Sequence, residues 1–301
     1  MSKVMTMPEA IRRFVNDGDV VVMEGFTHLI PFAAGHEIIR QKRRELTLVR
    51  LTPDLIYDQM IAAGCAQKVI FSWAGNPGVG PLHAFRRAVE QSIPRPLAFE
   101  EYSHFGMVLR LQAGASRLPF LPTRNYVGSD LPGVNPNIRP IDCPYTGEKL
   151  FAVPALHPDL AIVHAQRADD EGNTQIWGLP GVQKEAAFAA RRVMVVVEEI
   201  VPREVVHRDP NRTLIPGFIV SAVVEEPLGA HPSYVQGYYD RDNAFYFEYD
   251  EISRDQARLE AYLDEWVYGV ANRREYRAKL GERAEALKAH RALCEPVNYG
   301  F

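Results

Sequence analysis

The sequence predicts an α/β fold in which helices cover both faces of an open, mostly parallel sheet. Short runs rich in β-branched residues alternate with segments of helical periodicity, and this order is typical of βαβ units. Several of the runs are apolar throughout, as expected for strands covered on both faces. The chain has 301 residues, of which 47% are hydrophobic, so it can form a large core.

The regular elements follow one another in both halves of the chain. In the first half we predict strands over 19–24, 46–51 and 68–73, and helices over 8–16, 31–41 and 53–63. Pro53 suits the first turn of its helix, and Gly64 suits the position after the last turn. In the second half, apolar runs predict further strands over 159–165, 193–198 and 218–224.

Two segments depart from this pattern. Residues 120–151 are rich in Pro, Gly and Asn and show little periodicity, which indicates a long excursion: either a functional loop or an exposed linker between two halves. Residues 253–292 are charged and helical, and we expect a peripheral tail whose charges are solvated. We therefore predict a single domain over 1–301 with these two additions.

Composition excludes several classes of protein. The net charge is −4 and the Lys and Arg residues are scattered, so we expect no nucleic-acid partner. The N-terminus lacks the apolar core of a signal peptide, and no run approaches the roughly 18 apolar residues of a membrane span. A cytoplasmic protein without a membrane partner is expected. Cys65, Cys143 and Cys294 lie far apart, and we interpret them as buried thiols.

Two glycine-rich loops follow predicted strands. Residues 75–80 lie between a strand and a helix, where backbone N–H groups suit an anion, although a plain tight turn fits as well. The loop has neither the Walker pattern nor the GxGxxG order. Residues 23–31 form a second such loop around Gly25. In open α/β sheets ligands bind beyond the carboxyl ends of the strands, so both loops are predicted on the functional edge.

Two histidines sit in polar turns. His164 precedes Asp169 and Asp170 but lacks a metal-ligand spacing, so we interpret it as structural and predict no metal site. His231 lies in a loop shaped by Pro227 and Pro232, where acid–base chemistry and stapling of the loop are equally compatible with the sequence.

Residues 100–124 contain the densest group of candidate acid–base and nucleophilic side chains in the sequence. Glu100, Glu101, Ser103 and His104 lie within five positions. Ser103 and His104 are adjacent, so their side chains diverge and adjacency does not make them a nucleophile and base. A Gly-x-Ser-x-Gly elbow, which would indicate a hydrolase nucleophile, is absent from the sequence.

This window carries a resemblance to a known family. Glu-Glu-Tyr-Ser-x-Phe-Gly-Met at 100–107 and Gln-Ala-Gly-Ala-x-x-Leu-Pro-Phe-x-Pro-Thr-Arg at 112–124 resemble the A (α) subunit of family I CoA-transferases, the glutaconate and 3-oxoacid type. Further matching segments lie at 24–26, 154–159, 164–169, 172–173 and 226–232. The resemblance covers nearly the whole chain up to about residue 232.

The resemblance implies a subunit that works with a separately encoded B (β) subunit, often as an A2B2 heterotetramer with active sites at the A/B contact. It implies a ping-pong reaction in which a glutamate of the B subunit becomes a glutamyl-CoA thioester. The Ser-Glu-Asn-Gly stretch that carries this glutamate in many relatives is absent here. A coenzyme A thioester is then a substrate, and no permanently bound cofactor is implied.

The resemblance also suggests site residues. Gly25, Phe26, Asn76 and Gly78 would contact the thioester from the two glycine loops, and backbone donors there would stabilise an oxyanion. Within the motif window the candidate substrate or CoA contacts are Ser103, Gln112 and Gly114. A dicarboxylate would need a cation near its acyl pocket; Arg110 or Arg124 would serve, although a surface ion pair explains either equally well.

Two alternatives stay open. Some relatives in steroid-ring degradation hydrolyse a cyclic CoA ester with an acidic residue of the A subunit, and Glu101 lies in that region. If Glu101 merely precedes a helix, its charge complements the helix dipole. The other alternative is a non-catalytic acyl-CoA-binding scaffold.

Overall fold

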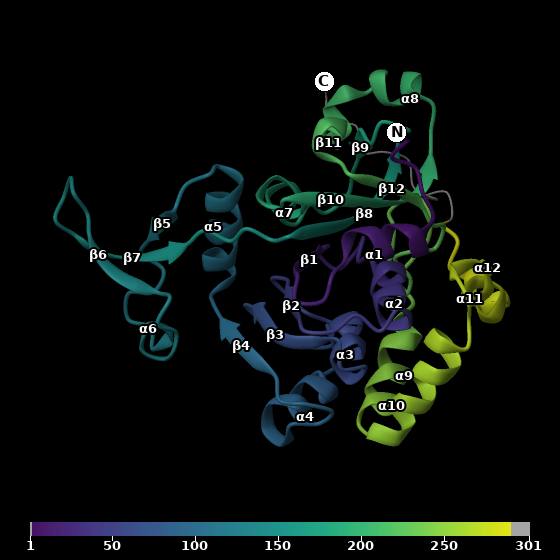
Figure 1. Ribbon diagram of the computed structural model, residues 1–301, viewed down its shortest axis with the longest axis horizontal. Helices are drawn as coiled ribbons and strands as arrows, with labels where there is room; N and C mark the ends of the chain where they lie inside the picture. Colours follow the sequence, from purple (N-terminus) through teal and green to yellow (C-terminus); the bar gives the residue numbers. More distant parts are fainter. Residues whose placement is uncertain (1, 290–301) are drawn as a thin grey trace, which may run out of the picture.

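The computed structural model describes residues 2–289 and contains a central, twisted parallel sheet (Figure 1). Seven strands lie in the order β12, β10, β8, β1, β2, β3, β4, and each neighbouring pair is parallel. Their bounds are β1 Val20–Glu24, β2 Leu46–Val49, β3 Ala66–Phe71, β4 Ala98–Glu101, β8 Leu160–Ala168, β10 Arg192–Ile200 and β12 Ala222–Glu225. The short strands β9 (Thr174–Gln175) and β11 (Thr213–Ile215) extend it beside β8 in antiparallel fashion.

Helices cover both faces of the sheet because its strands bury side chains on both. In β1, Val21 and Met23 belong to the core on one face, whereas Val22 belongs to the core on the other. The first face is covered by α1 (Met7–Phe14), α2 (Phe32–Arg40), α3 (Leu55–Ala62) and α4 (His83–Gln91). The second is covered by α5 (His104–Ala115) and α7 (Gln183–Ala189). The predicted fold class is thus confirmed.

The last predicted strand begins later than the sequence indicated. Residues Gly217–Ile219 form a single 3-10 turn, and pairing with β10 starts only at Ala222 opposite Met194. Pro216 precedes this turn, and the Phe218 side chain is 83% exposed. The apolar run 218–224 therefore combines a surface turn with a short buried strand, which apolar periodicity does not separate.

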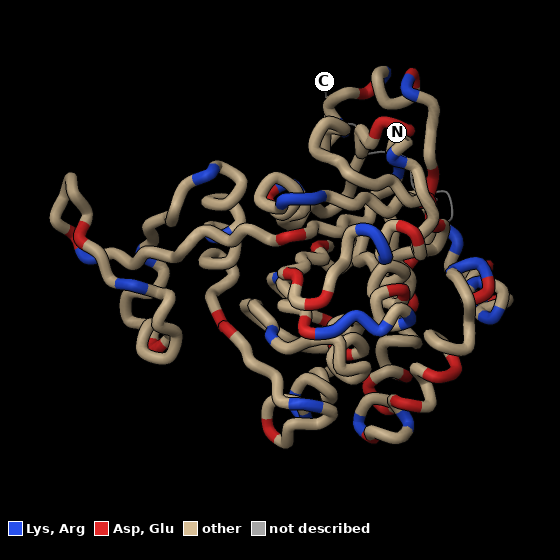
Figure 2. Tube along the Cα trace, in the orientation of Figure 1, with Lys and Arg blue, Asp and Glu red and all other residues tan. Residues whose placement is uncertain are grey.

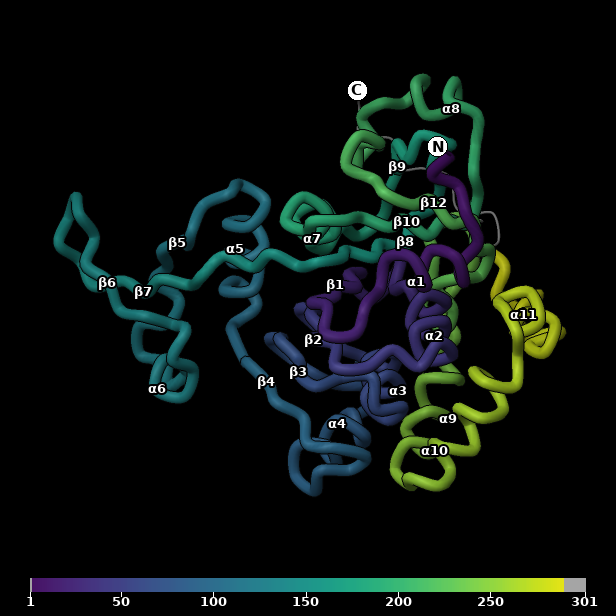
Figure 3. The backbone as a smooth tube through the Cα atoms, viewed as in Figure 1, coloured from purple at the N-terminus to yellow at the C-terminus, as the bar shows by residue number. Residues whose placement is uncertain are grey.

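The Pro- and Gly-rich excursion folds into an arm that projects from the body (Figures 1 and 3). It forms a three-stranded antiparallel sheet in the order β5, β7, β6, where β5 is Phe120–Thr123, β6 is Arg139–Asp142 and β7 is Lys149–Pro154. The turn α6 (Leu131–Val134) connects β5 to β6. Regular structure here was not predicted because each strand contains a proline, which weakens the strand pattern.

The C-terminal segment forms α9 (Asn243–Ser253), α10 (Gln256–Leu263), a π-helical turn (Asp264–Tyr268), α11 (Arg273–Leu280) and α12 (Glu282–Ala286). Charged positions spread over its outer surface (Figure 2), while Leu259, Tyr262, Leu263 and Val267 join the core beneath α2 and α3. Its last predicted positions, 290–292, lie outside the described residues. Among residues 2–289 there is no helix of the length and apolar character that crossing a bilayer requires.

The cysteines differ from one another in burial. Cys65 is buried, and burial raises the pKa of its thiol to about 12. Cys143 is only half-buried in the turn after β6, so the prediction of a buried thiol is wrong at this position. The turn that holds it lies at the tip of the arm, where little chain is available to cover it. Cys294 lies outside the described residues.

Candidate functional site

A pocket of about 230 Å³ opens at the carboxyl ends of β1, β2 and β3. The loops after these three strands form much of its wall, as expected for a ligand site of a parallel sheet. Segments from the C-terminal third of the chain complete it. Its lining residues are Phe26, Thr27, Ile30, Arg50, Thr52, Asp54, Trp73, Pro77, Tyr234, Arg241 and Tyr246.

Buried charges form the floor of this pocket. Arg50 is 1% exposed, and its Nη1 lies 2.9 Å from Oδ1 of Asp54. Its Nη2 donates to the Gly25 carbonyl at 2.7 Å. Beneath them the Glu24 carboxylate accepts the Leu51 N–H at 2.9 Å. Burial raises the pKa of Glu24 to about 7, although the nearby Arg50 opposes the shift.

The loop after β1 brings backbone donors to the rim of the pocket. A side chain at Gly25 would place its Cβ 2.5 Å from the carbonyl oxygens of His28 and Leu29, so the loop closes tightly only with glycine. Within residues 2–289, the N–H groups of Phe26 and Thr27 form no hydrogen bond. They are therefore available to an anionic oxygen. The Phe26 ring is 41% exposed at this rim.

The loop after β3 is closed on itself. The N–H groups of Asn76, Val79 and Gly80 donate to carbonyls of the same turn, and that of Gly75 donates to Pro53. The Asn76 side chain is buried, and its Nδ2 donates to the Tyr246 carbonyl at 2.8 Å. Gly78 lies exposed at the tip. Of this turn only Pro77 lines the pocket, so the geometry ties Asn76 to α9 and adds no support for substrate contacts from Asn76 or Gly78.

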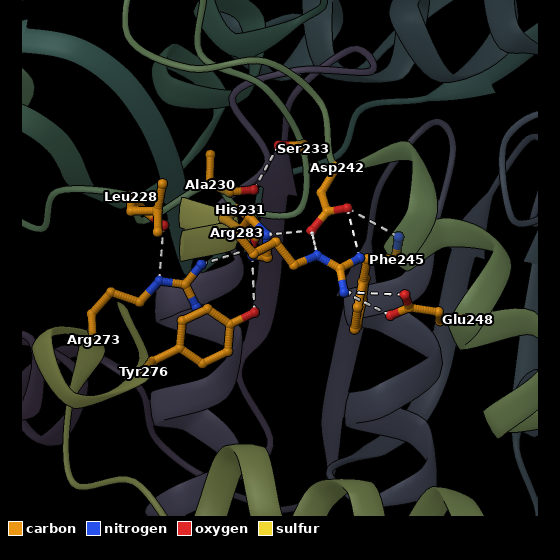
Figure 4. A network of polar contacts seen from close by, with 10 residues as sticks. All are labelled: Leu228, Ala230, His231, Ser233, Asp242, Phe245, Glu248, Arg273, Tyr276 and Arg283. Atoms are coloured by element: carbon orange, nitrogen blue, oxygen red, sulfur yellow. Dashed lines mark hydrogen bonds and ion pairs between the residues drawn. The ribbon is translucent and has the colours of Figure 1, made fainter. Parts of the chain in front are cut away.

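A polar network ties the loop after β12 to the C-terminal helices (Figure 4). His231 is buried between Tyr276 and Asp242, at 2.9 and 3.0 Å. Arg283 donates to both carboxylate oxygens of Asp242, and Arg273 donates to the carbonyl of His231. Burial lowers the pKa of His231 to about 4, although Asp242 opposes the shift. The geometry supports stapling of this loop, one of the two interpretations of His231.

The stapled loop supports the rim directly. Ser233 accepts the Ile30 N–H at 3.2 Å, and the Leu29 N–H donates to the Tyr234 carbonyl at 3.1 Å. The Tyr234 ring stacks on His28 with 4.8 Å between centroids. The C-terminal helices thus fix the position of Phe26 and Thr27 through two loops.

Glu100 and Glu101 have different surroundings at the end of β4. The Glu100 carboxylate pairs with Lys68 and accepts the Tyr102 hydroxyl at 3.0 Å. Although burial opposes it, the Lys68 ammonium holds the pKa of Glu100 below its usual value. Glu101 is exposed, and its backbone carbonyl accepts from Asn135 at 2.8 Å. Of the two, only Glu101 offers an exposed carboxylate, and neither lines the pocket.

Ser103 caps α5 by accepting the Gly106 N–H at 3.0 Å. Its hydroxyl also donates to the Tyr126 oxygen at 3.2 Å. Its neighbour His104 turns away and lies 3.0 Å from the Ser72 hydroxyl, which donates to the Leu51 carbonyl at 2.6 Å. The two polar groups of the motif therefore point apart, as predicted from their adjacency.

The remaining motif residues lie farther along α5. Gly114 packs against the loop at Leu156, whose carbonyl oxygen would lie 2.1 Å from an added Cβ. Gln112 is exposed over a shallow hollow between α5 and α7. Neither borders the pocket, so the geometry gives Gly114 a packing role.

The two arginines suggested for an acidic substrate also lie elsewhere. Arg110 is buried, stacks on the Tyr102 ring and lies 3.5 Å from Glu100. Arg124 is exposed on the arm and pairs with Glu148. The arginines that do line the pocket, Arg50 and Arg241, were missed. Arg50 lies near the carboxyl end of the strand predicted over 46–51, a signal that could have indicated it, whereas Arg241 reaches the pocket only through tertiary packing.

His164 is fully buried, and its Nε2 lies 2.8 Å from the Glu198 carboxylate. This contact supports the structural interpretation. In the described part of the chain, no group of three or more His, Cys, Asp or Glu side chains is arranged to hold a metal ion.

Comparison with known proteins identifies the family. A family model for coenzyme A transferases matches residues 4–226. The chain is 54% identical to the A subunit of 3-oxoadipate CoA-transferase from Pseudomonas knackmussii over 94% of this chain and 99% of that protein. The chain belongs to the coenzyme A transferase family. The family, the A-subunit type and the enzyme class inferred from the motif window are thereby confirmed.

Two other relatives also match most of this chain. The A subunit of glutaconate CoA-transferase from Acidaminococcus fermentans is 38% identical over 93% of this chain and 92% of that protein. The crystal structure of that enzyme superposes with a TM-score of 0.91 at 37% identity, covering 96% of each chain. One component of a cholesterol ring-cleaving hydrolase of Rhodococcus jostii is 30% identical over 85% of this chain and 88% of that protein.

Proposed function

We propose that this chain is the A subunit of a two-subunit CoA-transferase that moves CoA between an acyl-CoA and a small carboxylic acid. A separate B subunit supplies the nucleophilic glutamate, and the two associate as A2B2 across the carboxyl edge of the sheet. The relatives named as A subunits of CoA-transferases support this arrangement. The exchange requires no permanently bound cofactor, and the cytoplasmic location expected from the sequence stays a prediction.

The observation that carries the proposal is the state of the carboxylates at the pocket. Asp54, the one carboxylate that residues 2–289 contribute to its lining, is paired with Arg50, and Glu24 is buried beneath and held by the Leu51 N–H. A nucleophilic carboxylate must be able to reach the thioester carbon. The pocket therefore offers binding surface and backbone donors but needs a nucleophile from another chain.

The reaction follows from these parts. The partner's glutamate attacks the thioester carbonyl, whose oxygen gains negative charge, and CoA thiolate leaves to give an acyl-glutamyl anhydride. The thiolate then attacks the glutamyl carbonyl and releases the carboxylic acid as the glutamyl-CoA thioester forms; an incoming acid reverses these steps. We expect the N–H groups of Phe26 and Thr27 to stabilise the charged oxygen, an effect worth about 3–4 kcal/mol per donor.

Co-expression with a B-type subunit from the same organism tests the proposal. The purified complex should transfer CoA from acetyl-CoA or succinyl-CoA to short acids, whereas the isolated chain should not. Treatment with borohydride during turnover should reduce the glutamyl-CoA thioester on the B subunit while leaving this chain unmodified. Release of free CoA into water without exchange to any acid would contradict the transferase.

One observation keeps a hydrolase as a second candidate. Glu101 presents an exposed carboxylate at the same edge, and one relative belongs to a ring-cleaving hydrolase. In that case Glu101 would act as a general base toward water or a substrate carbon. A Glu101→Gln variant should retain exchange if the transferase proposal holds. If the wild-type complex instead releases CoA into water without exchange, a loss of this release by more than about 100-fold in an intact Glu101→Gln complex would favour the hydrolase.

A further inference from the structure

Arg241 is the feature of the pocket that the exchange reaction itself does not explain. Its guanidinium lies over the Tyr246 ring, with 3.6 Å from the central carbon to the ring centroid. It donates to Asn243 Oδ1 at 2.8 Å and to the Pro77 carbonyl at 2.9 Å. Both acceptors are uncharged, and an arginine carries five N–H donors, so donors are left for a ligand.

The other pocket cation is already neutralised. Arg50 forms a 2.9 Å ion pair with Asp54 and donates to Gly25. In contrast, no carboxylate within residues 2–289 lies at ion-pair distance from Arg241. Among residues 2–289, the lining holds two guanidinium groups and one carboxylate, and that carboxylate is paired with Arg50. A carboxylate held against the apolar wall would pair with the half-buried Arg241 through charge-assisted hydrogen bonds.

The walls indicate what carries that carboxylate. Phe26, Ile30, Trp73, Tyr234 and Tyr246 give the pocket an apolar lining. Its volume of about 230 Å³ is enough for a short acyl chain. An apolar pocket whose lining includes a guanidinium with only uncharged acceptors matches a chain with one acid group at each end.

We propose that Arg241 binds the distal carboxylate of a short dicarboxylic substrate and so determines which acids the enzyme accepts. The reacting carboxyl group then lies at the rim by Phe26 and Trp73, and the methylene chain lies along the apolar wall. The inference rests on the proposed CoA-transferase function, and it adds the substrate class. It replaces Arg110 and Arg124, which are paired with Glu100 and Glu148.

The test compares 3-oxoadipate with 3-oxohexanoate, which share a six-carbon 3-oxo chain and differ in the second carboxylate. Both are offered as acceptors to the co-expressed complex, with acetyl-CoA or succinyl-CoA as donor. In a ping-pong exchange kcat/KM for the acceptor does not depend on the donor, so the donor's own charge does not enter. The wild-type complex should prefer the diacid.

Replacing the guanidinium should remove this preference. Arg241→Gln should lower kcat/KM for 3-oxoadipate by roughly 10- to 100-fold, mainly through KM, and change that for 3-oxohexanoate by less than about threefold. Arg241→Lys should retain part of the preference. Arg86→Gln, on the exposed surface of α4, is the matched control and should change neither value.

The outcomes separate the two proposals. If the wild-type complex exchanges CoA with neither acid, the proposed function fails. If it exchanges but treats the acids alike, or if Arg241→Gln lowers both by the same factor, only the role of Arg241 fails; it then merely ties Pro77 to α9. Should Arg241→Gln not assemble, Arg241→Lys decides, because complete loss of the preference with retained charge would overturn the inference.

Discussion

Glu24 is a carboxyl group in a setting that disfavours its charge. It is 2% exposed at the end of β1, and burial raises its pKa to about 7, above the value of about 4.3 expected in an unfolded chain. Between these two values the folded protein binds more protons than the unfolded one. Folding stability from this residue is therefore greatest below about pH 4.3 and is lost as the pH rises through 7.

A Glu24→Gln variant should lose this pH dependence. The difference in free energy of unfolding between the variant and the wild type should move in the variant's favour by about 1–3 kcal/mol between pH 5 and pH 8. Denaturant titrations at several pH values measure both free energies of unfolding. The difference between variant and wild type is used because burial also raises the pKa of Glu226 to about 7, and the contribution of Glu226 cancels in that difference. Glu90→Gln on the exposed face of α4 is the control, and a flat difference would contradict the assignment.

At the scale of elements, α5 illustrates how one motif serves packing and capping. Gly114 allows close approach to Leu156, and Ser103 caps the first turn. The sequence resemblance placed both among candidate substrate contacts. In the structure, both residues contact other parts of the protein. Substitutions should therefore lower stability and leave activity unchanged, whereas substrate contacts would predict the reverse.

Gly114→Ala should destabilise the chain by about 1–3 kcal/mol, because the added Cβ requires the helix or the Leu156 loop to shift. Exchange activity per folded complex should be unchanged. Gly133→Ala is a suitable control, since nothing lies within 4 Å of a Cβ at that position. A large fall in kcat with normal thermal stability would instead return Gly114 to the site.

Ser103→Ala should cost about 1 kcal/mol through the lost cap of α5. Ser103→Asp keeps an acceptor at this position and should restore most of that stability. Thermal unfolding of the two variants checks the prediction. Equal losses in both would show that the contact with Tyr126, and not the cap, is the stabilising interaction.

Helices, strands and the loops at the carboxyl edge of the sheet were easier to predict from the sequence than contacts between distant segments. Gly25 and Gly75 follow apolar runs, so both loops could be placed at the carboxyl edge, and the structure has them there. The arm was not predicted as a sheet, because Pro122, Pro140 and Pro154 interrupt its strand pattern. Arg241 was missed because its position depends on the packing of distant segments, which local periodicity does not encode.

For the whole molecule, the C-terminal helices act as a support for the pocket rather than as a separate layer. Hydrogen bonds from His231 and Arg283 hold the pKa of Asp242 well below its usual range even though burial opposes this. The stapled loop in turn carries Ser233 and Tyr234, which bond and stack beneath the rim. Stability of the tail and geometry of the site are therefore coupled.

Arg283→Met should expose this coupling. The variant removes the ion pair between Arg283 and Asp242 and leaves the contact of Asp242 with His231. Because the Arg283 side chain is about one-third exposed, we expect the free energy of unfolding to fall by about 1–2 kcal/mol. KM for the acid should rise as the rim loosens. Arg277→Met, whose partner Glu285 is exposed, is the control. Reduced stability with unchanged KM would mean that the tail and the site are independent.

Trp73 gives the rim an optical signal. It is one of three tryptophans, and its ring is 44% exposed at the mouth of the pocket, whereas Trp177 and Trp266 are half-buried elsewhere. Indole emission moves to shorter wavelength when water leaves the ring. Binding of a substrate or of the second subunit at this edge can thus be followed by intrinsic fluorescence, with a Trp73→Phe variant, which keeps only the emission of Trp177 and Trp266, as the reference.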